Sequence, residues 1–153
     1  MIRTFAALAT IALLGFSLPA SADQHGTKDE AVAMVKRVEA MFAKDGSEAT
    51  FKAVSDKSVA EFHDRDLYPF IYDMNGNCVA HGARPALIGK NLIDLKDQDG
   101  KYLIREMVSL ANGPGSGWID YKWPNPLNNK IEDKASYVEK MSDYFVGVGI
   151  YKE

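Results

Sequence analysis

Three stretches near the C-terminal end of the chain alternate their side chains in the manner of β-strands. They cover roughly residues 117–123, 135–141 and 144–151, and only Ser142-Asp143 separates the last two. A period of two places successive side chains on opposite faces of a sheet. Because so short a connection joins antiparallel neighbours, this part of the chain is predicted to form an antiparallel sheet.

A second strand pair is predicted around a hairpin turn. The segment LYPFIYD, residues 67–73, is rich in aromatic and β-branched residues, and CVAH, residues 78–81, resumes the extended pattern after Asn75-Gly76. Asn-Gly strongly favours a tight hairpin turn. Pro69 cannot donate a ladder hydrogen bond, so we expect the first strand to lie at an edge or to contain a bulge.

A long helix is expected before this hairpin. Thr27 to Glu30 fits a capping box, and residues 27–44 repeat apolar side chains at helical spacing. Asp45-Gly46 is expected to break the helix, and a shorter helical piece follows over residues 47–54.

A long crossing segment and a further helix separate the hairpin from the three C-terminal strands. Residues 82–100 contain Pro85, two glycines and two apolar pairs, which indicates a loop with a helical turn or two. Asp99 is expected to cap a helix over residues 101–111. The element order predicts an α+β domain of PAS-like build, a five-stranded antiparallel sheet with the long N-terminal helix on one face.

Residues 1–22 have the pattern of a signal peptide. Arg3 precedes an uncharged apolar run that ends at Leu18, and Ala20-Ser21-Ala22 fits the small-x-small cleavage pattern. The run is shorter than the roughly 20 apolar residues of a membrane-spanning helix. We therefore expect cleavage after Ala22, no membrane insertion after that cleavage, and a periplasmic or secreted domain of residues 23–153.

The charge balance and the single cysteine limit the possible partners and chemistry. Without Arg3, 17 Lys and Arg stand against 21 Asp and Glu, a formal net charge of −4, and no basic stripe is present. This composition disfavours nucleic acid or anionic lipid as a partner. Cys78 has no internal disulfide partner, and in a strand it is expected to be a small buried hydrophobe.

Four motifs carry a resemblance to a known family. They are YDMNGNCVAHGARPALIGKNLIDLKDQDGK, GWIDYKWPNP, KASYVEK and YFVGVGIY, and their order resembles the single Cache domain, second type, over about residues 30–151. The resemblance implies an extracytoplasmic sensor fold that binds small organic ligands, often short-chain carboxylates. Cache domains are usually tethered to a transmembrane receptor or kinase. Because the chain stops two residues after Tyr151, we expect no attached output and a separate membrane receptor or sensor kinase as signalling partner.

The strand 117–123 carries aromatic residues on both faces. Trp118 points one way, whereas Tyr121 and Trp123 point the other. This distribution suits a sheet with a helix behind it and a roofed pocket in front, although ordinary core packing is the alternative. In the last strand Gly147 and Gly149 leave a trough on one face, which either a ligand or the long helix could approach closely.

The expected ligand contacts combine cations, neutral donors and aromatic walls. Lys134 and Tyr137 stand in KASY, where the resemblance implies a ligand-contacting lysine and tyrosine, and Lys134 is the expected carboxylate anchor. Arg84 and Lys90 are weaker candidates, because such residues are more often surface charges. The full predicted set is Tyr72, His81, Trp118, Tyr121, Trp123, Lys134, Tyr137 and Gly149.

Two other functions remain open at this point, a protein-interaction module in an envelope signalling system and an enzyme that uses Cys78 or His81. Three residues apart on a strand, those two side chains face opposite ways unless a bulge intervenes. No cofactor or metal is expected. The histidines are scattered, and the calcium-like segment 95–106 begins with Leu95 in place of a carboxylate.

Overall fold

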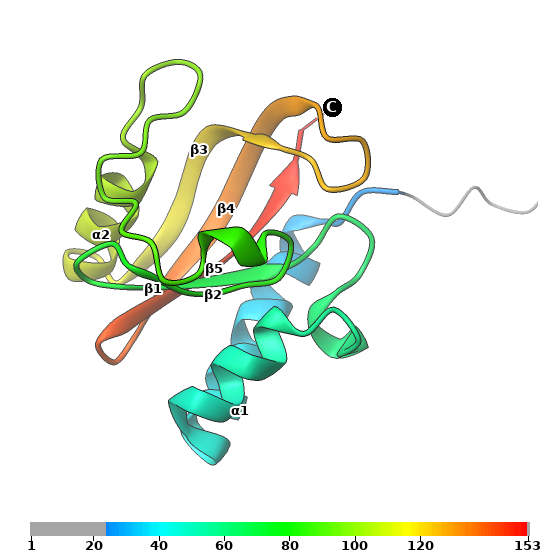
Figure 1. Ribbon diagram of the computed structural model, residues 1–153, viewed down its shortest axis with the longest axis vertical. Helices are drawn as coiled ribbons and strands as arrows, with labels where there is room; N and C mark the ends of the chain where they lie inside the picture. Colours follow the sequence, from blue (N-terminus) through cyan, green and yellow to red (C-terminus); the bar gives the residue numbers. More distant parts are fainter. Residues whose placement is uncertain (1–23, 153) are drawn as a thin grey trace, which may run out of the picture.

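The computed structural model describes residues 24–152 and contains one five-stranded antiparallel sheet (Figure 1). Its strand order is β2-β1-β5-β4-β3. The helices are α1 (Lys28–Ser55) and α2 (Leu103–Asn112), with short 3-10 turns at Ala60–Phe62 and Pro85–Leu87. The strands are β1 (Pro69–Asp73), β2 (Cys78–His81), β3 (Ser116–Pro124), β4 (Ile131–Met141) and β5 (Tyr144–Tyr151). The predicted α+β class, element order and PAS-like sheet are confirmed.

The helix α1 begins at the predicted capping box. The Glu30 N–H donates to the Thr27 hydroxyl at 3.3 Å, and the Glu30 carboxylate accepts the Thr27 N–H at 2.8 Å. Gly46, with φ 81° and ψ 177°, interrupts the helical backbone at the predicted place. The chain re-enters the helix and continues to Ser55, so the two predicted helical pieces form one kinked element.

Each face of the sheet packs against different elements, which gives two cores. The helix α1 covers one face, and α2 with the crossing segment covers the other (Figure 1). Alternate residues of one strand therefore enter different cores, as Ile71 does on the α1 face and Phe70 on the α2 face. This two-sided burial explains why aromatic residues occur on both faces of β3.

The hairpin between β1 and β2 turns at Asn75-Gly76 as predicted. Gly76 has φ 84°, and the Asp73 carboxylate accepts the N–H groups of Asn75 and Asn77, both at 2.9 Å. Of the two alternatives predicted for the strand that contains Pro69, the edge position is wrong, because β1 lies between β2 and β5. Pro69 is the first residue of β1, and a bulge does occur in the β1–β2 pairing, where Val79 of β2 is skipped between the partners of Ile71 and Tyr72.

The segment before α2 forms a turn in place of a helix cap. The Asp97 carboxylate accepts the N–H groups of Asp99, Lys101 and Lys122 at 2.9–3.0 Å, which ties this turn to β3. The prediction that Asp99 caps the helix is wrong. Gly100 at φ 84° keeps the backbone out of the helix, and α2 starts after Tyr102 without a side-chain cap.

Candidate functional site

Six of the eight predicted ligand residues lie on the α2 face of the sheet. They are Tyr72, His81, Tyr121, Trp123, Lys134 and Gly149. The strand register brings several together, since Tyr121 pairs with Lys134 across β3 and β4. The Tyr121 hydroxyl lies 2.8 Å from that of Ser136, which pairs with Gly149 across β4 and β5.

Trp118 and Tyr137, the other two predicted residues, lie on the α1 face of the sheet. Their place in the predicted set is therefore corrected. They pair across β3 and β4, their ring centroids are 5.6 Å apart, and both pack against the core beneath α1. The Lys28 ammonium lies 5.1 Å from the centre of the Trp118 ring. Because the sheet separates this pair from Lys134, we leave both residues out of the candidate site.

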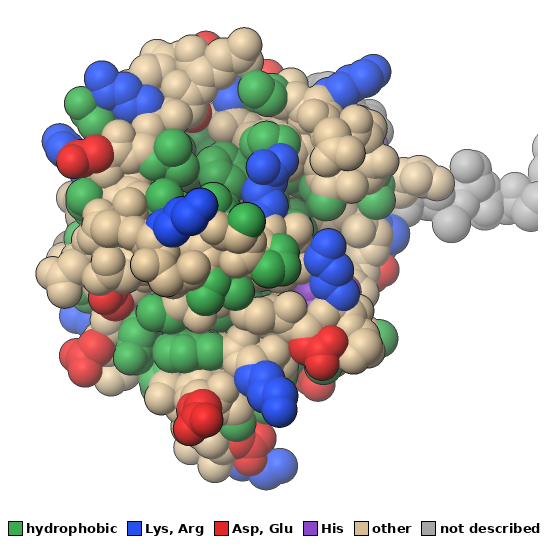
Figure 2. Space-filling view, in the orientation of Figure 1, with side chains coloured by type: hydrophobic (Ala, Val, Ile, Leu, Met, Phe, Trp, Pro, Cys, Tyr) green, Lys and Arg blue, Asp and Glu red, His purple; other side chains and the backbone are tan. Residues whose placement is uncertain are grey.

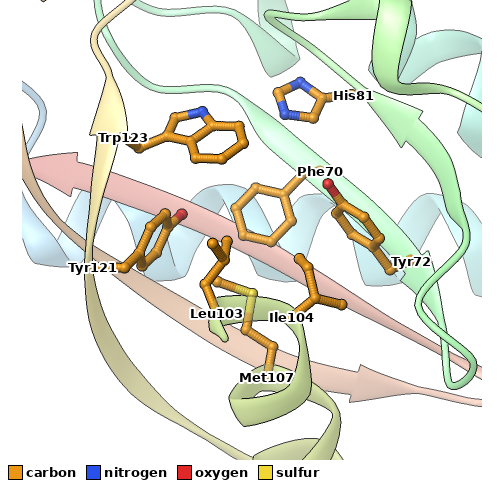
Figure 3. A pocket seen from close by; sticks show the side chains of 8 residues that line it. All are labelled: Phe70, Tyr72, His81, Leu103, Ile104, Met107, Tyr121 and Trp123. Carbon is orange, nitrogen blue, oxygen red and sulfur yellow. The ribbon is translucent and has the colours of Figure 1, made fainter. Parts of the chain in front are cut away.

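A small cavity lies between the sheet and α2 (Figure 3). His81, Tyr121 and Trp123 bring polar atoms to its wall, whereas α2 contributes Leu103, Ile104 and Met107, which lie together on the other side in Figure 3. Phe70 and Tyr72 complete the lining. The volume is about 10 Å³, which is room for one water and no more.

A wider, charged hollow of about 320 Å³ adjoins this cavity, and Tyr121 lines both. Its other lining residues include Lys134 and Lys122 from the strands and Asp97 and Lys101 from the segment before α2. Figure 2 shows a depression on the face of the molecule that Figure 1 presents, with hydrophobic side chains in it and Lys or Arg side chains beside it.

Lys134 is buried, with 1% of its surface exposed, and its ammonium contacts only neutral groups of residues 24–152. The Nζ atom donates to the Tyr68 hydroxyl at 2.7 Å and to the Tyr151 hydroxyl at 3.4 Å. It also lies 4.1 Å and 4.8 Å from the centres of these rings. Burial, together with the charge of Arg84, lowers the Lys134 pKa to about 7, although Asp66 opposes the shift.

The hydroxyl groups around Lys134 form a directional chain. Tyr151 donates to the Pro124 carbonyl at 2.8 Å, so Tyr68 donates to Tyr151 at 3.1 Å and accepts from Lys134. Burial raises the Tyr68 pKa to about 12, which keeps that hydroxyl neutral. The chain fixes the ammonium between β4, β5 and the end of β3.

His81 is a neutral hydrogen-bond donor in this arrangement. Its Nδ1 atom accepts the N–H groups of Ala83 at 3.2 Å and Arg84 at 3.0 Å, which leaves the proton on Nε2. Burial and the charges of Lys134 and Arg84 lower the His81 pKa to about 3. The ring stacks on Tyr68 at 5.4 Å and on Trp123 at 6.5 Å, and it lies over the cavity in Figure 3.

The trough at Gly147 and Gly149 is occupied by neighbouring side chains. A Cβ atom on Gly149 would lie 2.3 Å from the Lys134 Cε and from the Ser136 hydroxyl, and one on Gly147 would lie 2.3 Å from the Phe70 ring. The glycines therefore face the α2 side of the sheet, and they give Lys134 and Phe70 room to lie flat against it.

The bulge in the β1–β2 pairing leaves Val79 of β2 without a partner, and it places Cys78 and His81 on the same face, whereas regular alternation predicts opposite faces. The two side chains nevertheless use different partners. The Cys78 thiol donates to the Ala80 carbonyl at 3.7 Å, and burial raises its pKa to about 11. As predicted, Cys78 is buried and behaves as a small core residue.

Comparison with known proteins places the chain in a family. A model of the Cache domain matches residues 26–153. The chain belongs to the Cache domain family. Cache domains are extracytoplasmic sensor domains of kinases and chemoreceptors, so the predicted resemblance is confirmed. Within residues 24–152 of this Cache domain, no helix has both the length and the apolar character needed to cross a membrane.

Two curated relatives contain a similar segment. The sensor histidine kinase MctS of Rhizobium johnstonii is 33% identical over 118 residues, 74% of this Cache domain chain and 25% of the kinase. The methyl-accepting chemotaxis protein McpP of Pseudomonas putida is 33% identical over 91 residues, 58% of this chain and 17% of the receptor. The chain therefore spans about a quarter or less of the length of these signalling proteins.

Solved structures confirm the fold of this Cache domain. A methyl-accepting chemotaxis protein from Vibrio parahaemolyticus has a TM-score of 0.69 and 28% identity over 81% of this chain and 87% of that one. A Cache chemosensory domain whose structure concerns carboxylic acid recognition has a TM-score of 0.65 over 82% of this chain and 88% of that one. Because the sequence identity to this second structure is 24%, the similarity shows a shared fold only.

Three residues of the Cache domain site were absent from the predicted set. They are Tyr68, Ser136 and Tyr151, which hold Lys134 or Tyr121 by hydrogen bonds. Tyr151 shares the alternation of Gly147 and Gly149, so its face was predictable from the sequence. Tyr68 precedes β1, and no periodic pattern indicates its direction.

Proposed function

We propose that this Cache domain binds a small organic anion, with short-chain carboxylates as the favoured class, and that Lys134 is the anchor. The supporting observation is a buried ammonium with no carboxylate of residues 24–152 within ion-pair distance. Asp66 is engaged elsewhere, with His25 at 2.8 Å and the Gly26 N–H at 2.7 Å. A ligand carboxylate at Nζ forms a charge-assisted hydrogen bond in a nearly dry site.

The neighbouring cavity accounts for the rest of the ligand. The Nε2–H of His81 supplies a neutral donor, Tyr121 and Trp123 supply stiff aromatic walls, and α2 supplies an aliphatic surface. The cavity of about 10 Å³ is smaller than a carboxylic acid. A ligand that extends into this cavity therefore needs α2 or the crossing segment to move outward.

The signalling role follows from the relatives. Because both curated relatives are signalling receptors, we propose that the domain serves a sensor kinase or chemoreceptor in the cell envelope. No catalytic step is part of this proposal. The high pKa of Cys78 and the engagement of the His81 Nδ1 atom by backbone N–H groups disfavour a thiolate–imidazole pair.

Export is part of the proposed function and rests on residues outside the described range. The pattern Ala20-Ser21-Ala22 favours cleavage after Ala22, so we propose that the exported protein starts at Asp23. Intact-mass measurement of protein from the periplasm tests this. A mass that retains Met1 or the apolar run argues against cleavage.

A thermal-shift screen tests the ligand class. Acetate, propionate, pyruvate and lactate are compared with amines and neutral amides of similar size at constant ionic strength. We expect stabilisation that saturates with at least one acid and none with the amines. Stabilisation by amines alone contradicts an anion site, and recovery of a protein partner without any acid effect favours the interaction-module alternative.

A further inference from the structure

Arg84 follows β2 and turns back over the candidate site. Its backbone N–H donates to the His81 Nδ1 atom at 3.0 Å, so the chain folds around the imidazole ring. Its side chain is half-buried, and the guanidinium carbon lies 5.8 Å from the centre of the Trp123 ring, which lines the cavity. This geometry differs from that of Lys90 on the same segment, which is exposed.

Neither Arg84 nor Lys134 forms an ion pair within residues 24–152. In the described part of the chain neither side chain has a carboxylate within 4.0 Å, whereas Arg65 pairs with Glu30 and Arg105 pairs with Asp94. The Arg84 charge also acts on the other groups of the site, since it lowers the pKa values of Lys134 and His81. Two cations thus repel one another across a largely buried cluster.

A cluster of aromatic rings connects the two cations. Lys134 contacts Tyr68, Tyr68 stacks on His81 at 5.4 Å, His81 stacks on Trp123 at 6.5 Å, and Arg84 lies over Trp123. Because Lys134 and Arg84 contact different rings of this cluster, each can hold a separate carboxylate. A short carbon chain can join two such carboxylates.

We propose that Arg84 is a second anchor of the site and that the domain prefers small dicarboxylates to monocarboxylates of the same chain length. This inference rests on the proposed function, with Lys134 holding the first carboxylate. Arg84 then holds the second through its planar pair of N–H donors, a geometry that suits carboxylate oxygens.

Calorimetric titration with matched acids tests this preference. Malonate, succinate and glutarate are compared with propionate, butyrate and valerate at fixed pH and ionic strength. We expect at least one diacid to bind about tenfold more tightly than its monoacid, and Arg84→Gln to bring that ratio close to one. Lys90→Gln removes the same charge from the same segment and should leave the ratio unchanged, while melting temperatures check that each variant is folded.

The outcomes separate this inference from the proposed function. Monoacids that bind as tightly as diacids, or a diacid preference that survives Arg84→Gln, overturn the second anchor while leaving the carboxylate site intact. If Lys90→Gln lowers the ratio as much as Arg84→Gln does, the preference reflects the general field of the surface and the inference is also overturned. If neither series binds, the proposed function fails together with it.

Discussion

The ammonium of Lys134 donates to the hydroxyl of Tyr68 at 2.7 Å, although the two residues are 66 positions apart in the chain. The contact joins β4 to the residue before β1, across β5. A buried lysine held by phenols keeps its position while its charge stays unneutralised. That combination supports a site built for an anion from outside the protein.

Matched removal of two hydroxyl groups tests the face assignment. Tyr68→Phe deletes the acceptor of the Lys134 hydrogen bond, and we expect it to weaken acid binding about tenfold, a cost of about 1.4 kcal/mol. Tyr137→Phe removes a hydroxyl on the α1 face and should leave binding unchanged. Titration calorimetry of both variants measures these effects, and the reverse pattern contradicts the assignment of Tyr137 to the α1 face.

A methyl group on Gly149 should disturb the anchor directly. Gly149→Ala places a Cβ atom 2.3 Å from the Lys134 Cε, so we expect a loss of about 1–3 kcal/mol in folding free energy and loss of the acid-induced stabilisation. In a Lys134→Ala background the same change should cost less, because part of the clash is gone. Equal costs in both backgrounds, measured by urea unfolding, contradict the packing of Lys134 on Gly149.

The pKa of Lys134 predicts a pH dependence of the unliganded protein. Below pH 7 the lysine is protonated in both the folded and unfolded states, whereas between about 7 and 10.5 only the unfolded chain holds the proton. Stability should therefore rise with pH above 7, by up to about 1.4 kcal/mol per unit. Urea unfolding should be measured below pH 9. Above that pH the unfolded chain loses the Cys78 proton while the folded protein keeps it, because burial raises the Cys78 pKa to about 11, and this lowers stability as the pH rises.

Acid binding should show the opposite trend. The ligand requires the protonated ammonium, so affinity should be nearly constant below pH 7 and fall above it, with uptake of a proton. His81 does not contribute, because its pKa of about 3 keeps it neutral throughout. Calorimetry in buffers of different ionisation enthalpy measures the proton uptake, and flat affinity from about pH 6 to 8.5 would contradict it.

Local patterns predicted the elements and part of the register. The turn Ser142-Asp143 fixes the pairing of β4 with β5, and the Lys134–Tyr151 and Ser136–Gly149 pairs follow from it by counting. The same counting indicates that Tyr137 does not share a face with Lys134, because residues three apart on a regular strand face opposite ways. The resemblance in KASY drew both residues into one site, although alternation separates them.

Contacts between distant segments could not be predicted in the same way. Six residues separate β3 from β4, so the loop length leaves the Tyr121–Lys134 pair open. The bulge that turns Cys78 and His81 to one face depends on tertiary packing. Tyr68 and Arg84 lie in irregular segments, where no periodicity reports the direction of a side chain.

The most direct measurement compares wild type with Lys134→Met in the presence of the acid that stabilises the wild type most. At about a hundred times its dissociation constant, the acid should add about 2.7 kcal/mol and raise the melting temperature by roughly 8–12 °C. Lys134→Met keeps most of the side-chain volume and removes an unpaired buried charge, so the unliganded variant should be at least as stable as wild type. The acid-induced rise should disappear in the variant. A full rise in Lys134→Met would contradict the assignment of Lys134 as the anchor.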